Sequence, residues 1–207
     1  IAHLDSLTEA IFLEMFGDPV ANPMGWARSA ISELVDRFEA GKSIETSAGD
    51  RDARYWVIKV SAITSGYYRP EEVKPIPAGY SPPPGHFVRR GDLLFSRANT
   101  EALVGASALV DVDSQNQVLS DKIWRFVWKA GAPVLPEYVW QTLQAPRVRE
   151  AIGGLATGTS GSMKNVSQAK LATLQISIPP LVKQRVFVDR FHSVRSSVWS
   201  CQGLVDT

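Results

Sequence analysis

The sequence predicts an α+β fold, in which a twisted, mixed or antiparallel β-rich domain is flanked by an amphipathic helix at each end. Three observations support this prediction. Apolar residues recur at helical spacing near both ends, β-rich segments fill the middle, and turns rich in Gly, Pro and Asn separate those segments. With 207 residues, of which 44% are hydrophobic and 21% charged, the chain can bury a sizeable core.

The first 17 residues are expected to form an amphipathic helix. Leu4, Leu7, Ile11 and Met15 fall on one stripe, and Gly17 is the glycine typical of a helix end. The Asp-Pro that follows stops the helix, because proline cannot continue it. The sequence then predicts a polar connector, a short helix and a loop.

The middle of the chain is expected to consist mainly of strands. The short helix is expected over 29–38 and the loop over 41–54. A turn-rich excursion with six prolines spans 63–87. β-Branched and aromatic residues are concentrated in five segments that are predicted to form one core sheet: 55–60, 91–97, 103–112, 122–128 and 171–178.

Two helices are predicted before the last strand and a third after it. Pro136 and Pro146 suit the first turns of helices over "EYVWQTLQ" and "RVREAIGGL". After "PP" at 179–180, apolar residues at helical spacing predict a second amphipathic helix. Because each terminal helix has an apolar stripe to bury, we expect residues 1–17 and 181–198 to lie side by side on one flank of the domain.

Hydropathy, cysteine content and charge restrict where the protein is expected to work and what it is expected to bind. No apolar run is long enough to cross a bilayer and no signal segment opens the chain, so we expect a cytoplasmic location. Cys201 is the single cysteine, which excludes an intramolecular disulfide. Residues 1–50 hold nine acidic and three basic residues, whereas 147–195 hold two acidic and eight basic ones. This division favours a polyanionic partner for the later part, although mutual attraction of the two parts would give the same pattern.

The stretch "LATGTSGSMKNVSQAKL" (155–171) is the first candidate for a binding site. It is rich in Gly, Ser and Thr, and it contains two lysines and no acidic residue. Such a stretch is either a plain surface loop or a loop whose backbone N–H groups, hydroxyls and lysines close on an anion. Amide side chains in it suit an adenine edge. The candidate DNA contacts are Thr159, Ser160, Ser162, Lys164, Asn165 and Gln168.

The segment "FSRANTE" (95–101) is the second candidate. Arg97 has the geometry to grip a guanine with two hydrogen bonds, and Ser96, Asn99 and Thr100 have polar groups for bases or phosphates. The alternative is a strand end and turn in which Arg97 pairs with Glu101. The loop "GTSGSMKN" is expected to lie beside the tip of this segment, so that both form one basic concave face.

The segment "SGYYRP" (65–70) is the third candidate. Tyr67, Tyr68 and Arg69 lie on the proline-rich excursion, where they are suited to stacking or to hydrogen bonds with a DNA backbone. The alternative for the tyrosines is that they anchor the loop by packing.

Catalytic arrangements are not evident in the sequence. His3, His86 and His192 are scattered over different expected elements, which argues against a metal site, and no glycine-rich nucleotide-binding turn is present. Glu72 and Lys74 in "PEEVK" have the spacing of some nuclease motifs, but they lie in the proline-rich excursion. We therefore expect no catalytic residue, no metal and no cofactor.

Four segments resemble the specificity subunit of type I restriction–modification systems: "LDSLTEAIFLEMFGDPVANPMGW", "GDLLFSRANTEALVGASALV", "LPEYVWQTLQAPRVREAI" and "ATGTSGSMKNVSQAKLATLQISIPPLVKQ". They keep the family's order and cover nearly the whole chain. The resemblance implies a conserved helix segment at 1–17, a target recognition domain at 18–178, and the start of a second conserved helix with a tail at 179–207.

The resemblance also implies a function. A non-catalytic subunit of this family binds double-stranded DNA in a sequence-specific manner without a cofactor, and it positions methyltransferase and restriction subunits. Members carry two recognition domains, whereas this chain resembles one, which leaves open a homodimer or a second recognition domain. The alternative is a protein-interaction scaffold that holds those subunits without reading DNA.

Overall fold

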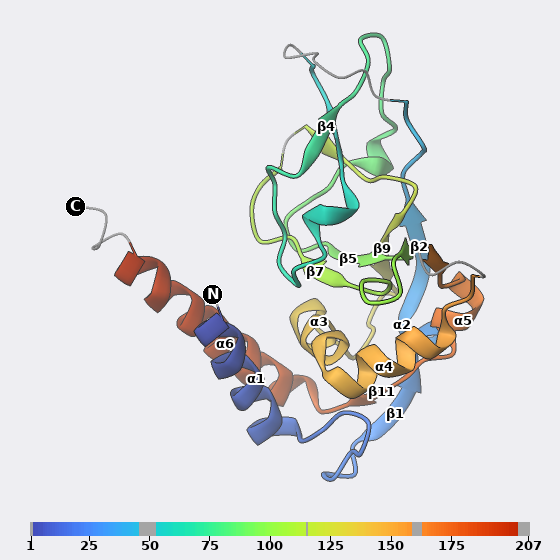
Figure 1. Ribbon diagram of the computed structural model, residues 1–207. Coiled ribbons are helices and arrows are strands. Elements are labelled where there is room, and N and C mark those ends of the chain that lie inside the picture. The colour runs from blue at the N-terminus through green and yellow to red at the C-terminus, as the bar shows by residue number, and fades with distance from the viewer. Residues whose placement is uncertain (1, 46–52, 115, 159–162, 203–207) are drawn as a thin grey trace.

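A computed structural model describes residues 2–45, 53–114, 116–158 and 163–202, without the side chains of 2–5 and 196–202. Helices and strands alternate irregularly along the chain (Figure 1). The predicted α+β class is confirmed. The elements are α1 (Ala2–Phe16), β1 (Ala27–Ala30), α2 (Ile31–Leu34), β2 (Val35–Ala40), β3 (Trp56–Ile58), η1 (Val60–Ala62), β4 (Val73–Pro75), η2 (Pro84–His86), β5 (Leu93–Ser96), β6 (Ala98–Asn99), β7 (Ser107–Leu109), β8 (Gln117–Val118), β9 (Ile123–Trp128), α3 (Pro136–Gln144), α4 (Pro146–Leu155), β10 (Lys164–Asn165), α5 (Gln168–Ala172), β11 (Gln175–Ile178) and α6 (Leu181–Gln202).

The described strands lie in four sheets, so the prediction of one core sheet is wrong. The largest sheet is antiparallel with the order β2-β9-β5-β7, and a three-stranded sheet has the order β4-β3-β8. β1 pairs with β11, and β6 pairs with β10. Of the five predicted segments, 91–97, 103–112 and 122–128 contribute to the largest sheet. The segments 55–60 and 171–178 supply β3 and β11 of two other sheets, in which β3 pairs with β4 and β8, and β11 pairs with β1.

Two local predictions are also wrong. Residues 29–38 form β1, one helical turn and β2 instead of a short helix. The reason is that Phe38 packs across the sheet on Trp124 and Phe126, with ring centroids 5.4 and 5.1 Å away. The segment 171–178 was predicted to be a strand throughout, but its first two residues are the end of α5 and the strand begins at residue 175. The helix forms there because the Ser167 hydroxyl caps its first turn.

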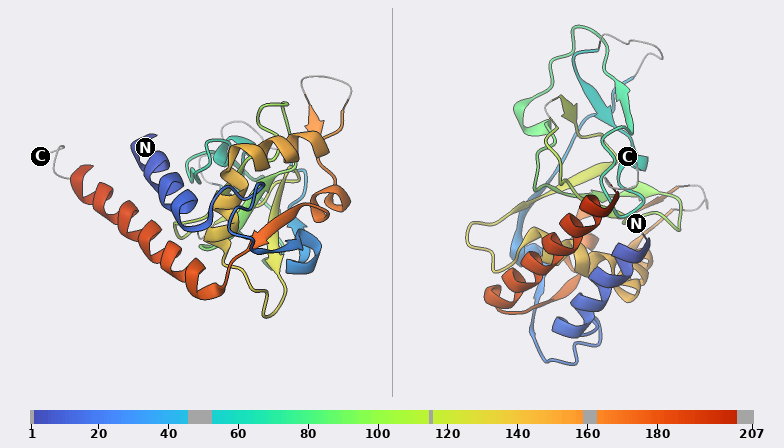
Figure 2. Two further views of the ribbon diagram at one scale, coloured as in Figure 1. Left: turned by 90° about the horizontal axis from the view of Figure 1, so that it is seen from below. Right: turned by 90° about the vertical axis from the view of Figure 1, so that its left-hand side faces the viewer.

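The two long terminal helices lie side by side, as predicted (Figures 1 and 2). Phe12 and Phe16 of α1 contact Phe187 of α6, with ring centroids 5.6 and 5.8 Å apart. The buried stripe of α1 differs from the predicted one, since Leu7 is 48% exposed whereas Thr8, Phe12 and Phe16 are buried. Large aromatic rings bury more apolar surface than leucine does, so they determine which face turns inward.

A buried glutamine joins α6 to the domain. Gln184 is fully buried, and its Oε1 accepts a hydrogen bond from the backbone N–H of Leu135 at 2.8 Å. Its Nε2 donates to the carbonyls of Pro133 and Pro179 at 2.9 and 2.8 Å. Because these bonds connect three segments, they fix the direction in which α6 leaves the domain.

Candidate nucleic-acid interface

A short antiparallel ribbon brings together the two segments singled out first by the sequence. β6 and β10 pair so that Lys164 lies opposite Asn99 and Asn165 opposite Ala98. The backbone N–H of Val166 extends the pairing, because it donates to the carbonyl of Arg97 at 2.9 Å. For Lys164 and Asn165, at the end of the loop "GTSGSMKN", the predicted position beside the tip of "FSRANTE" is therefore confirmed. We call residues 97–100 and 164–168 the ribbon.

Backbone contacts around Gly158 bring the segment after the loop back beside the segment before it. Thr157 and Asn165 exchange two backbone hydrogen bonds of 2.8 Å. Gly158 has a φ of +148°, and a Cβ there would lie 2.5 Å from the carbonyl oxygen of Met163. Only glycine allows this close approach. The candidate contacts Thr159, Ser160 and Ser162 lie outside the described residues.

Arg97 is half-buried at the base of the ribbon. Its Nε donates to the carbonyl of Asp121 at 2.7 Å, and its backbone N–H donates to the carbonyl of Lys122 at 3.0 Å. Among the described residues Arg97 forms no ion pair, so the pairing with Glu101 that the sequence left open is not present. The guanidinium is thus oriented by one bond, while its two terminal amino groups stay available to a ligand.

The other polar side chains of the ribbon keep donors available. Lys164 is half-buried, and its ammonium donates to the carbonyl of Gly158 at 3.2 Å. Asn99 uses its Oδ1 to accept from the backbone N–H of Thr100 at 2.8 Å, and Thr100 itself is exposed. Gln168 is exposed, with one long hydrogen bond of 3.5 Å to a backbone carbonyl. These groups can donate to phosphate or to base edges without breaking the core.

Two predicted contacts are turned inward. Ser96 is fully buried in β5, and its hydroxyl has no hydrogen-bond partner among the described residues. Tyr68 is also buried, its hydroxyl donates to the side-chain carbonyl of Gln117, and burial raises its pKa to about 12. Tyr68 is therefore a packing anchor, which was the alternative for the tyrosines. Neither side chain reaches the surface in this conformation.

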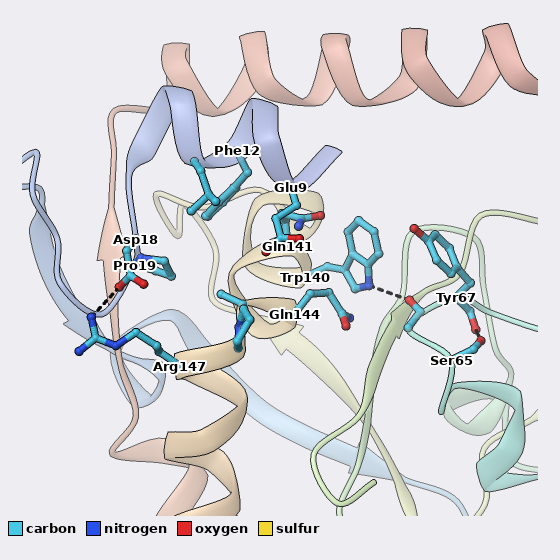
Figure 3. A pocket seen from close by; sticks show the side chains of 14 residues that line it. Glu9, Phe12, Asp18, Pro19, Ser65, Tyr67, Trp140, Gln141, Gln144 and Arg147 are labelled. Carbon is cyan, nitrogen blue, oxygen red and sulfur yellow. Dashed lines mark hydrogen bonds and ion pairs between the residues drawn. The ribbon is translucent and has the colours of Figure 1, made fainter. Parts of the chain in front are cut away.

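The third segment lies apart from the ribbon, beside a cleft. Tyr67 packs edge-on against Trp140, with ring centroids 5.9 Å apart, and Arg195 lies over its ring at 5.8 Å. The cleft, of about 380 Å³, runs between α1, the junction of α3 with α4 and the turn at 65–67 (Figure 3). Arg69 is exposed on the following turn.

Two basic residues of 147–195 are paired with acidic side chains elsewhere in the protein. Arg147 pairs with Asp18 at 3.4 Å, and Arg195 pairs with Asp111. The Arg147 pair joins the acidic and basic parts of the chain, which was the alternative explanation of the charge division. Of the basic residues in 147–195, Lys164 lies in the ribbon. Lys122, whose carbonyl accepts from the backbone N–H of Arg97, was not among the predicted contacts. The sequence places it at the start of the predicted strand 122–128, directly after an aspartate.

Two classes of feature are absent from the described residues. None of their helices is both long enough and apolar enough to cross a membrane. In the same ranges, no three His, Cys, Asp or Glu side chains come together as a metal site.

Sequence comparisons relate the chain to specificity subunits. It is 30% identical over 168 residues to the Type I restriction enzyme EcoEI specificity subunit of Escherichia coli, covering 80% of this chain and 28% of that protein. It is 26% identical over 136 residues to the EcoKI specificity subunit of Escherichia coli strain K12, covering 65% of this chain and 29% of that protein. The chain thus spans less than a third of the length of these relatives. No protein-family model matches the sequence.

Solved structures with the same fold agree with this relation. An HsdS subunit from Thermoanaerobacter tengcongensis matches with a TM-score of 0.57 and 17% identity, over 96% of this chain and 45% of that one. A chain from a structure on complex assembly and conformational transition of the type I R-M system matches with a TM-score of 0.60 and 17% identity, over 98% and 47%. The type I S subunit from M. genitalium matches with a TM-score of 0.53 and 14% identity, over 81% and 38%. Because the sequence identities to these structures are only 14–17%, the structural likeness establishes the shared fold alone.

Proposed function

Because this chain belongs to the family of type I restriction enzyme specificity subunits, we propose that it is one DNA-recognition unit of such a subunit. It binds double-stranded DNA and reads a sequence through its ribbon. Phosphate contacts set the register of the protein on the duplex, and contacts with base edges discriminate between sequences. The unit itself performs no catalysis.

The pairing of β6 with β10 is the observation that supports this proposal most directly. It places Arg97, Asn99 and Lys164, from segments more than sixty residues apart, on one short ribbon. A two-stranded ribbon is narrow enough to enter a major groove about 12 Å wide. The available amino groups of Arg97 suit a guanine, and the amide of Asn165 suits an adenine.

The two terminal helices suit a different task. α1 and α6 lie together on the flank of the domain, and the ribbon belongs to other elements. We propose that they connect this unit to the methyltransferase and restriction subunits, and to a second recognition unit in a homodimer or a longer chain. On this proposal residues 18–178 form the recognition domain, and 1–17 and 179–207 belong to the connecting helices. The scaffold alternative assigns the helices the same task but leaves the ribbon without one.

The test is DNA binding by the whole chain, with a preferred duplex first selected from a randomised pool. Lys164→Ala should weaken binding to all duplexes about equally, and it should lower the slope of log affinity against log salt by about one, because one phosphate contact is lost. Arg97→Ala should instead cost roughly 1–3 kcal/mol on the preferred duplex and relax discrimination at one base pair.

The matched control is Arg185→Ala, which removes one exposed charge from α6 and should leave DNA binding as in the wild type. If the wild type shows neither a preferred sequence nor a steep salt dependence, the scaffold alternative is correct.

A further inference from the structure

Four lysines line one cleft next to the ribbon. The cleft, of about 240 Å³, lies where the three-stranded sheet meets the four-stranded sheet. Lys42 follows β2, Lys59 follows β3, Lys74 lies in β4 and Lys122 precedes β9. Among the described residues that line it, Asp121 is the acidic one. We call this site the lysine cleft.

Most of its positive charge is not neutralised by the protein. Lys59 lies 3.5 Å from Glu72. In the part of the chain that the structure describes, Lys42, Lys74 and Lys122 form no ion pair. Like charges held in one cleft repel one another, and a cleft lined by one sign of charge concentrates its field and attracts counter-ions. The lysine cleft is therefore suited to an anion.

The backbone around the cleft is held closely. Gly41 donates from its backbone N–H to the carbonyl of Ser120 at 3.2 Å, and Lys42 pairs with Ser120 in an isolated bridge. A Cβ at Gly41 would collide with the carbonyl of Leu119, so glycine is required there. The hydroxyl of Ser120 is buried and has no hydrogen-bond partner among the described residues. The segments that carry Lys42 and Lys122 are therefore held at fixed positions on the wall of the cleft.

The cleft is continuous with the ribbon. Asp121 and Lys122, which line the cleft, accept hydrogen bonds from Arg97 through their backbone carbonyls. Arg97 in turn begins the ribbon. A duplex that contacts Arg97 therefore has the lysine cleft next to it, and duplex DNA carries one negative charge per about 1.7 Å of its axis.

We propose that the lysine cleft binds backbone phosphates of the same duplex whose bases the ribbon reads. This inference rests on the proposed function, and it assigns a phosphate-binding site outside the three segments that the sequence singled out. Lysine ammonium groups donate to phosphate oxygens without distinguishing bases, so the cleft supplies affinity and register. The ribbon supplies discrimination.

The test compares two variants with the same loss of charge. The cleft variant combines Lys42→Gln, Lys74→Gln and Lys122→Gln. The control variant combines Lys183→Gln, Arg185→Gln and Arg190→Gln on the exposed face of α6, far from β4 (Figure 1). Binding of the whole chain to its preferred duplex and to a random duplex is measured at several salt concentrations.

The cleft variant should bind both duplexes more weakly by the same factor, and its salt slope should fall by roughly two to three, because each phosphate contact contributes about 0.9. The ratio between preferred and random duplex should stay at the wild-type value. The control variant should keep the wild-type slope. If the triple substitution prevents folding, Lys74→Gln on its exposed strand should lower the slope by about one.

Two results would overturn the inference, and they have different meanings. If the wild type binds steeply but the cleft variant has the wild-type slope, the proposed function stands and the cleft does not contact DNA. The same conclusion holds if the wild-type cleft binds inorganic phosphate but the cleft variant binds DNA as the wild type does. The cleft then binds a small anion instead of DNA. If the wild type itself binds no duplex, the proposed function fails together with the inference.

Discussion

Arg125 offers the sharpest test of how the domain is held together. It projects from β9 into a nearly closed site, where its side chain is 10% exposed. Its guanidinium pairs with Glu39 of β2 and with Asp92 at 3.0 Å, and it donates to the carbonyls of Gly85 and Phe87 at 2.6 and 2.9 Å. One side chain thus connects the largest sheet to the end of the proline-rich excursion.

The expected cost follows from what Arg125→Met would leave behind. Asp92, 16% exposed, would lose its charged partner, and two carbonyls would lose their donor. Glu39 would keep Arg37, whose Nε donates to it at 3.0 Å. Removing one partner of a buried ion pair lowers the free energy of unfolding by about 3–5 kcal/mol. Since Glu39 stays paired, we expect about 3 kcal/mol, which for a urea slope of about 3 kcal/mol/M moves the midpoint by about 1 M.

Urea unfolding followed by circular dichroism measures this midpoint. Arg37→Met is the matched control, because Arg37 contacts the same Glu39 but is largely exposed, and its midpoint should stay close to the wild-type value. Adding Asp92→Asn to Arg125→Met should recover part of the loss, because no unpaired carboxylate then remains in the buried site. Equal midpoints for Arg125→Met and Arg37→Met would refute the reasoning. If Arg125→Met does not fold, Arg125→Lys, which keeps the charge but not the fork of donors, should lie between it and the wild type.

Three further predictions concern stability. Phe12→Ala should lower the free energy of unfolding by about 3–5 kcal/mol in the same assay, because the Phe12 ring of α1 is buried against Tyr138 of α3 and Phe187 of α6. Gly105→Ala should lower the midpoint more than Gly131→Ala. Both glycines have positive φ, but a Cβ at Gly105 would collide with the side chains of Ile152 and Arg149, whereas a Cβ at Gly131 would have open space. Burial would raise the pKa of Glu39, but hydrogen bonds from arginines outweigh it and hold the pKa below its ordinary value. Ionised Glu39 therefore stabilises the fold above the unfolded carboxyl pKa of about 4.3, and the stability gap between wild type and Glu39→Gln should close as the pH falls through the folded pKa.

The longer helices could be predicted well because their signals are local, whereas the one-turn α2 and the short α5 could not. Pro136 and Pro146 occupy the first turns of α3 and α4, as their fixed φ favours. The strands could be predicted only in part. β5, β7 and β9 are buried and apolar, whereas β1 has the sequence "ARSA", with no apolar alternation to reveal it.

The division into sheets could not be predicted, because it depends on pairing between distant segments. Trp56 lies opposite Gln117 in the parallel pair of β3 and β8, sixty-one residues further along the chain. Nothing near either residue specifies the other, and strand preference mostly records how well a side chain fits its neighbours in the sheet. Which strands form one sheet is settled only when distant segments pack together.

The same distinction explains the site. The pairing of β6 with β10 could be anticipated, because each segment already had a composition suited to anions. The lysine cleft could not, since its lysines come from four segments, and in two of them acidic neighbours hide the charge: Lys74 follows two glutamates and Lys122 follows Asp121. In the fold, Glu72 turns to Ser61 and Lys59, with its Oε2 accepting from the Ser61 hydroxyl at 2.6 Å, while Lys74 faces the cleft. Charge counted along the chain therefore placed the basic surface at 147–195. The fold instead pairs Arg147 and Arg195 of that run with acidic residues, and it gathers lysines that no single stretch of sequence contains.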